Sequence, residues 1–138
     1  MHFDQEFFKK FDFEANEIER YFQSALHDFE IAQKDKFPEV KFTYSYQALI
    51  KIGITLLTKV GKVKVRSAPG HHVKILEKMS EILGDEDILA IGNAMRMKRN
   101  TDLYGGGTLM GAKEADDYLE FVHKVIRKAE KIIGSRSL

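Results

Sequence analysis

The residues best suited to chemistry lie in one short stretch, AMRMKRNTDLYGGG, which spans residues 94–107. Apolar residues before it recur at helical spacing, and that spacing places Arg99 on the extension of the apolar stripe. Arg96 and Asp102 lie three residues to either side and share its face of the predicted helix. A guanidinium at the edge of a core offers a planar fork of donors that suits a phosphate. The stretch therefore predicts an anion site, against the simpler alternative of an Arg99–Asp102 pair worth roughly a few tenths of a kcal/mol.

Other chemistries find little support in the sequence. The chain has no cysteine, which excludes disulfides, thiol catalysis and cysteine-zinc sites. The run GGTLMGAK has the glycine spacing of a phosphate loop, but Ala112 stands where the lysine belongs and neither serine nor threonine follows it. His71 and His72 are neighbours, and on a helix such side chains diverge by about 100°, too far to share a metal in regular geometry. We expect no metal and no cofactor, and we interpret the histidines as a turn feature or, second, as an anion contact at His71.

The elements that must position these residues are predicted to be helices. The apolar periodicity gives helices at residues 7–32, 38–60, 69–83, 86–104 and 115–133. Asp85 is a suitable N-cap, and Gly61, Gly84 and Gly134 are suitable stops. The segment 61–70, GKVKVRSAPG, alternates Lys and Val like a short strand, but with no second strand to pair with we expect a loop. The pattern predicts an all-α fold, an antiparallel up-and-down helical bundle of about five helices in a single domain, residues 1–138.

Composition and charge set the class of protein. The chain is 43% hydrophobic and 31% charged with a net charge of +1, which is ordinary for a globular domain. Residues 1–30 hold three basic against eight acidic residues, whereas residues 51–78 hold seven against one, an asymmetry that favours an anionic ligand or merely differently solvated faces. The most apolar run, residues 48–57, is too short to span a bilayer, and the first residues do not read as a secretion signal. We expect a soluble, cytoplasmic protein without membrane contact.

Three stretches carry a family resemblance. They are SYQALIKIGITLLTKVG (residues 45–61), APGHHVKILEKM (68–79) and MRMKRNTDLY (95–104). The first resembles the second helix of the HEPN domains (higher eukaryotes and prokaryotes nucleotide-binding), and the second resembles the entry to that family's third helix. The third is similar to the family signature, an arginine followed by a polar residue, three further residues and a histidine. The resemblance covers about residues 13–133 and implies a small helical bundle of a kind often encoded beside a minimal nucleotidyltransferase.

The signature matches this chain residue by residue except at its end. Arg99 matches the arginine and Asn100 the polar position, but Tyr104 stands in place of the histidine. A subgroup of the family ends in Asp and Tyr, and here Leu103 occupies the Asp position while the acid lies at Asp102. In HEPN ribonucleases two copies of the motif face each other across a dimer. The arginine binds the scissile phosphate, and the histidine handles the 2′-hydroxyl proton without a metal.

The resemblance implies a homodimer that binds a nucleotide or RNA phosphate and pairs with a minimal nucleotidyltransferase in a toxin–antitoxin-like arrangement. It places the binding site at Arg96, Arg99, Asn100, Asp102 and Tyr104, with His71 as a further contact. Tyrosine ordinarily has a pKa of about 10 and is a poor base at neutral pH, so a binding module is favoured. The alternative is a metal-independent endoribonuclease toxin using Arg99 and Tyr104 across the dimer cleft. A purely structural or interaction bundle is the second alternative.

Overall fold

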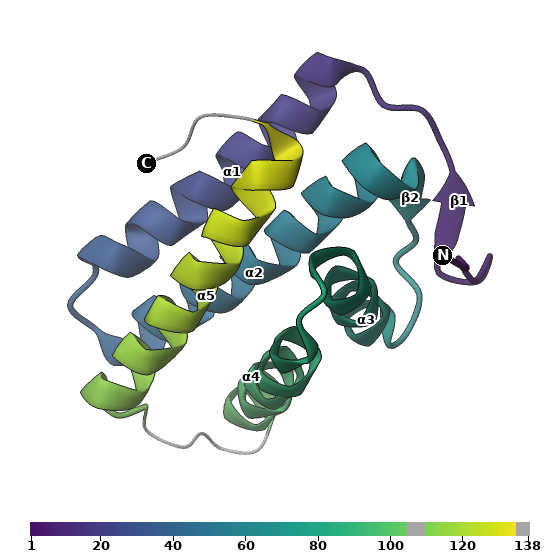
Figure 1. The fold of residues 1–138 in the computed structure, drawn as a ribbon. Helices are drawn as coiled ribbons and strands as arrows, with labels where there is room; N and C mark the ends of the chain where they lie inside the picture. The colour runs from purple at the N-terminus through teal and green to yellow at the C-terminus, as the bar shows by residue number, and fades with distance from the viewer. Residues whose placement is uncertain (105–109, 135–138) are drawn as a thin grey trace.

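The protein is a helical bundle. The computed structural model describes residues 1–104 and 110–134, and for residues 101–104 it describes the backbone alone. Within these ranges it contains the α-helices α1 (Ala15–Lys34), α2 (Pro38–Leu56), α3 (His71–Leu83), α4 (Glu86–Tyr104) and α5 (Ala112–Ile133) (Figure 1). The predicted all-α bundle is confirmed. No helix in the described part of the chain has an apolar stretch long enough to cross a membrane.

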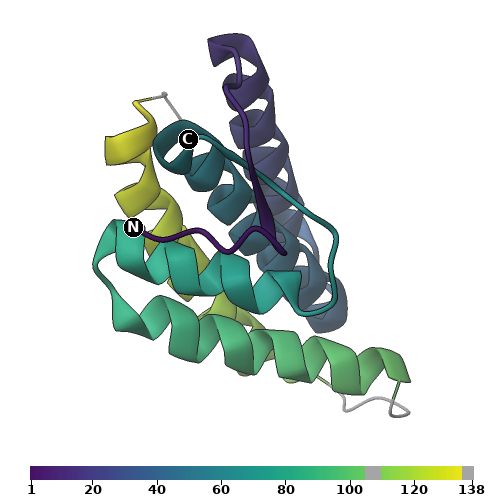
Figure 2. The same ribbon diagram turned by 90° about the vertical axis from the view of Figure 1, so that its right-hand side faces the viewer.

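The helices form two groups around α2. In Figure 1, α1 and α5 lie along α2, with α1 antiparallel to it and α5 running in the same direction. Helices α3 and α4 form an antiparallel hairpin that crosses this layer, as Figure 2 shows from the side. A strict up-and-down order would make α5 antiparallel to α2, but the crossing hairpin returns the chain to the end of the layer where α2 begins (Figure 1).

The helix boundaries follow from local chemistry that the sequence predicts. Helix α2 begins at Pro38, whose missing N–H costs nothing at a helix start. The Asp85 carboxylate accepts a hydrogen bond from the N–H of Asp87 at 3.0 Å and so caps α4. Gly84 and Gly134 end α3 and α5 in left-handed backbone, with φ of 62° and 77°. Each of these four signals is confirmed by the element that it bounds.

The predicted first helix is wrong at its start, and the predicted loop at residues 61–70 is partly wrong. Strand β1 (Phe8–Lys10) pairs antiparallel with β2 (Val63–Val65), so each strand supplies the partner that the sequence pattern did not reveal. The ribbon forms because pairing buries Phe8 and Val63, which are 3% and 4% exposed. This burial outweighs the helical spacing of the phenylalanines, and α1 begins only at Ala15.

The end of α2 also differs from the prediction. Regular α-helix ends at Leu56 and continues as a π-helical turn, η1 (Leu57–Gly61), after which Lys62 adopts left-handed backbone with φ of 51°. Gly61 lies under the ring of Phe3, and a Cβ at this position would come within 2.7 Å of Phe3 Cζ. Glycine here therefore lets the N-terminal segment pack against the π-helical turn.

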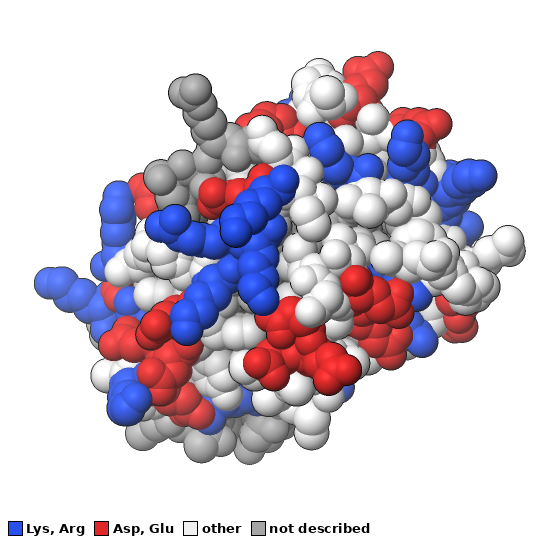
Figure 3. All heavy atoms as spheres, viewed as in Figure 1, with Lys and Arg blue, Asp and Glu red and all other residues white. Residues whose placement is uncertain are grey.

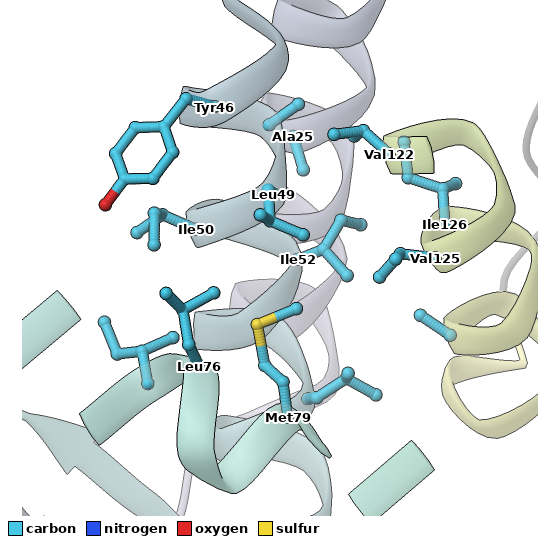
Figure 4. Close-up of a cluster of buried hydrophobic side chains, with 14 of the residues drawn as sticks. Ala25, Tyr46, Leu49, Ile50, Ile52, Leu76, Met79, Val122, Val125 and Ile126 are labelled. Atoms are coloured by element: carbon cyan, nitrogen blue, oxygen red, sulfur yellow. The ribbon is translucent and has the colours of Figure 1, made fainter. Parts of the chain in front are cut away.

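The core is centred on α2. Ile52 lies among side chains of α5 and α3, including Val125 and Met79, with Ala25 of α1 nearby (Figure 4). All of these side chains are buried. The ring of Tyr46 points away from α1 and α5, toward the side of α2 that the α3–α4 hairpin covers (Figure 4). The core thus positions α2 between the α1–α5 side and the side where Tyr46 meets the hairpin.

Substitution of Gly53 by alanine is expected to destabilise the protein. Gly53 faces α3 so closely that a Cβ would overlap Ile75 Cγ2 and lie 2.5 Å from Met79 Sδ. Met79 is flexible, but the branched side chain of Ile75 has no room to withdraw. We expect a loss of about 1–3 kcal/mol in the free energy of unfolding, larger than the gain of up to about 1 kcal/mol in helix propensity. Urea denaturation measures it, and an equally stable G53A protein would contradict the packing.

The control for this prediction introduces Gly53→Ala into a protein that already carries Ile75→Ala. In that background the added methyl group has space, so Gly53→Ala should cost much less than in the native chain. Equal costs in the two backgrounds would show that Ile75 is not the obstacle.

Candidate functional site

Arg99 lies where α4 approaches α2. Its guanidinium carbon is 5.5 Å from the centroid of the Tyr46 ring, within the range of a cation–π interaction. Tyr46 is 1% exposed, whereas Arg99 is partly exposed. The side chain that interrupts the predicted apolar stripe therefore packs its guanidinium over a buried aromatic ring at the core edge. This contact places the fork of donors beside Tyr46.

Tyr46 also contacts a histidine of α3. Its hydroxyl lies 2.8 Å from Nδ1 of His72, and the two rings are 5.7 Å apart. Burial raises the pKa of Tyr46 to about 12, against the opposing charges of Arg99 and Arg96, so the phenol keeps its proton at neutral pH. Because a phenol that keeps its proton can donate it, we assign Tyr46 as donor and His72 Nδ1 as acceptor. The proton of the neutral imidazole is then on Nε2, which becomes a donor.

The protonation of His72 follows from its surroundings. Burial, and then the charges of His71 and the two arginines, lowers the pKa of His72 to about 4. At neutral pH the imidazole is therefore uncharged, and the positive charge of this cluster comes from Arg96 and Arg99. Within the described residues no carboxylate forms an ion pair with either arginine.

Arg96 and His71 are each fixed by their own helix. Arg96 Nε donates to the side-chain oxygen of Asn93 at 2.9 Å, which orients the guanidinium along α4. His71 Nδ1 donates to the carbonyl oxygen of Ala68 at 2.8 Å, so the histidine closes the turn that precedes α3. The rings of His71 and His72 are 4.5 Å apart. With its Nδ1 proton engaged, His71 presents an unprotonated Nε2 in its neutral form and becomes a second donor only when charged.

We call the cluster of Tyr46, His72, Arg96 and Arg99 the Tyr46 site. Of the residues expected from the sequence, the structure brings Arg96, Arg99 and His71 to this region. Asn100 is exposed on the same helix. The side chains of Asp102 and Tyr104, the Arg99–Asp102 pair and the run of glycines at 105–107 lie outside the described residues.

Sequence reasoning missed two members of the site, Tyr46 and His72. Tyr46 lies on the apolar stripe of α2, where a side chain ordinarily serves the core, but a buried hydroxyl ordinarily needs a hydrogen-bond partner. That requirement was the available signal, and His72 satisfies it from a position 26 residues further along the chain.

Two hollows of the molecule lie away from the Tyr46 site. Cavities of about 380 Å³ and 320 Å³ lie between α1, η1 and α5 and between α4 and α5, and neither is lined by Arg99 or His72. No group of three or more potential metal-ligating side chains occurs in the described residues. The chain matches no family model, no curated protein and no solved structure.

The low pKa of His72 predicts that stability falls in mild acid. The pKa of His72 is lowered from 6.5 to about 4 by folding, so unfolding takes up a proton between these values. The stability that the folded protein gains from the uncharged state of His72 is fully present above pH 6.5 and is lost as the pH falls toward 4. Unfolding by urea at a series of pH values should show this slope, and His72→Gln, which retains an acceptor for Tyr46, should flatten it. The exposed His27→Gln control should keep the slope; a flat profile in the native protein would contradict the prediction.

Proposed function

We propose that this protein binds the phosphate group of a nucleotide or RNA at the Tyr46 site, as a HEPN-like binding module. The observation that carries the proposal is the Arg99 guanidinium held 5.5 Å above the ring of Tyr46, whose hydroxyl also orients His72. The charges of Arg99 and Arg96 both act on His72, whose neutral imidazole is a further donor beside them. Such an arrangement favours an anion with several acceptor oxygens.

The electrostatics of the free site support the same proposal. Burial first, and then the charges of His71, Arg99 and Arg96, hold the pKa of His72 well below its ordinary value. A bound phosphate would neutralise part of the arginine charge, so the pKa of His72 should rise on binding.

The experiment that tests the proposal follows His72 directly. Two-dimensional NMR of the imidazole resonances is recorded while inorganic phosphate or ATP is added at millimolar concentration. The resonances of His72 should shift and its pKa should rise, whereas exposed His27 should be unaffected. Unchanged His72 resonances with both ligands would refute binding at this site.

We also propose that the protein is a homodimer and that it pairs with a minimal nucleotidyltransferase. Met97 lies between Arg96 and the site's central residue Arg99 in sequence and is 57% exposed, and Phe37 is 68% exposed. Exposed large apolar side chains favour a contact with another chain. Light scattering coupled to size exclusion should give roughly twice the 15.9 kDa chain mass. A monomer at micromolar concentration would contradict the dimer without affecting phosphate binding.

The alternative function is metal-independent RNA cleavage. What favours it is the imidazole of His72 in the site, since the family signature here ends in Tyr104 rather than histidine. A base whose pKa is about 4 is weak at neutral pH, however, which makes binding the better proposal. Robust RNA cleavage in the presence of a chelator, lost in Tyr104→Phe, would reverse this order.

A further inference from the structure

The two-stranded ribbon collects positive charge from distant parts of the sequence. Strand β1 contributes Lys9 and Lys10, and β2 with its flanking residues contributes Lys62, Lys64 and Arg66. All five side chains are exposed, and we call them the basic ribbon. In Figure 3, lysine and arginine side chains gather at the upper right, where β1 and β2 lie in Figure 1.

The register places like charges directly opposite each other. Lys9 pairs with Lys64 in the antiparallel ladder, so the two ammonium groups share one face. The ladder continues in both directions, because Arg66 donates its N–H to Phe7 at 2.7 Å and Phe11 donates its N–H to Lys62 at 2.9 Å. Opposed like charges destabilise a ribbon that is already short, so their presence needs an explanation beyond folding.

Two general explanations do not account for the pattern. Lysines on exposed strands prevent unwanted pairing with other strands, but a glutamate opposite a lysine would do the same and add an ion pair. Cations also favour helix C-termini, which explains the basic second half of α5, where Lys128 additionally pairs with Asp85 at 2.6 Å. Lys62 is the C-cap residue of η1, so a helix C-terminus favours its charge, but Lys9 and Lys10 lie on β1 and belong to no helix. Within the described residues the one ion pair of the basic ribbon joins Lys62 to Asp12 at 4.0 Å.

An aromatic side chain lies beside these charges. Phe11 is 41% exposed, and its ring lies 4.6 Å from that of Phe13, which holds it in place. Proteins bind single-stranded nucleic acids by combining a row of cationic side chains with an exposed aromatic ring. The cations contact the phosphates, and the ring stacks on a base. Arg66 and His71 are five positions apart in the chain, so their Cα atoms lie at most roughly 18 Å from each other, and the ring of His71 contacts that of His72 in the Tyr46 site.

We propose that the basic ribbon binds the phosphate backbone of a single-stranded nucleic acid that extends from Phe11 toward the Tyr46 site. The contact at the ribbon is independent of base sequence. The extension to the Tyr46 site rests on the function proposed above, and it makes a polymer rather than a mononucleotide the preferred ligand.

The experiment measures binding of a fluorescein-labelled single-stranded oligouridylate by anisotropy over a range of salt concentrations. The variant is Lys9→Gln with Lys64→Gln, and the matched control is Lys124→Gln with Lys131→Gln on the basic half of α5. The ribbon variant should bind about tenfold more weakly at low salt, with a salt slope smaller in magnitude by about 1.4. It should also be more stable to urea than the native protein, because a like-charge pair is removed. Weaker binding therefore cannot result from unfolding.

The remaining results of this binding experiment would each overturn a particular proposal. If the ribbon variant and the α5 control lose oligonucleotide affinity equally, or if neither loses any, the proposal is overturned. Binding of inorganic phosphate at the Tyr46 site without oligonucleotide binding would overturn the ribbon proposal alone, whereas absence of both would refute the proposed function as well. Lysine-dependent binding to vesicles containing anionic lipid, without oligonucleotide binding, would assign the ribbon to a membrane surface and overturn the proposal.

Discussion

Replacing Arg99 with alanine is expected to weaken binding of phosphate or a nucleotide by about tenfold or more. The reason is that a charge-assisted contact with a phosphate is worth about 1.5–3 kcal/mol, and 1.4 kcal/mol corresponds to a factor of ten. The guanidinium is already positioned over the ring of Tyr46, so little ordering remains for the ligand to impose. Stability should change by only about 0.5–1 kcal/mol, the value of a cation–π contact at a partly exposed position. Calorimetric titration measures the binding, and urea denaturation measures the stability.

Two control variants separate geometry from charge. Arg99→Lys keeps the charge but loses the planar fork, so it should recover only part of the affinity. Arg127→Ala removes the same charge from the exposed face of α5 and should leave binding unchanged. Large destabilisation of Arg99→Ala with unchanged binding would assign Arg99 a purely structural role.

Replacing Ile52 with alanine is expected to lower the free energy of unfolding by about 2–5 kcal/mol. Ile52 is fully buried on α2, near side chains of α5 and α3 (Figure 4). The cavity created there would be lined from three helices, and because each is fixed by other contacts, their collapse around it is limited. Urea denaturation should show the midpoint shifted with the slope unchanged.

The matched control is Ile132→Ala, which deletes the same atoms from a side chain that is 38% exposed. It should change stability by no more than about 0.5 kcal/mol. A loss below about 1 kcal/mol for Ile52→Ala would mean that the three helices repack around the deletion.

The sequence predicted those parts of the fold that depend on local interactions. The Asp85 cap and the glycines at positions 84 and 134 act within one helical turn, so their effect is visible in a short stretch of residues. The β1–β2 ribbon could not be predicted in this way, because neither strand is stable without the other. The spacing of the phenylalanines in residues 7–32 also does not distinguish a helix from the ribbon. Phe8 is buried in the core although it lies on a strand.

The sequence predicted which side chain α4 contributes to the site, but not which side chains of α2 and α3 it meets there. Periodicity placed Arg99 on the inward face of α4, and the structure puts its guanidinium over a buried ring. The identity of that ring depends on how the α3–α4 hairpin crosses α2, which helix periodicity does not determine. Tyr46 and His72 therefore entered the site through tertiary packing. The roles of Asp102 and Tyr104 stay predictions.

The π-helical turn Leu57–Gly61 determines where this chain tolerates a change of length. Each hydrogen-bonded ring of a π-helix contains one residue more than that of an α-helix. A homologous chain that lacks one residue between Leu57 and Gly61 can therefore close the same turn as regular α-helix and still deliver its next segment to β2. The same deletion within α2 would rotate every later side chain by about 100° and remove Ile52 or Tyr46 from its contacts. When sequences of varying length are aligned with this one, the gap belongs in the π-helical turn.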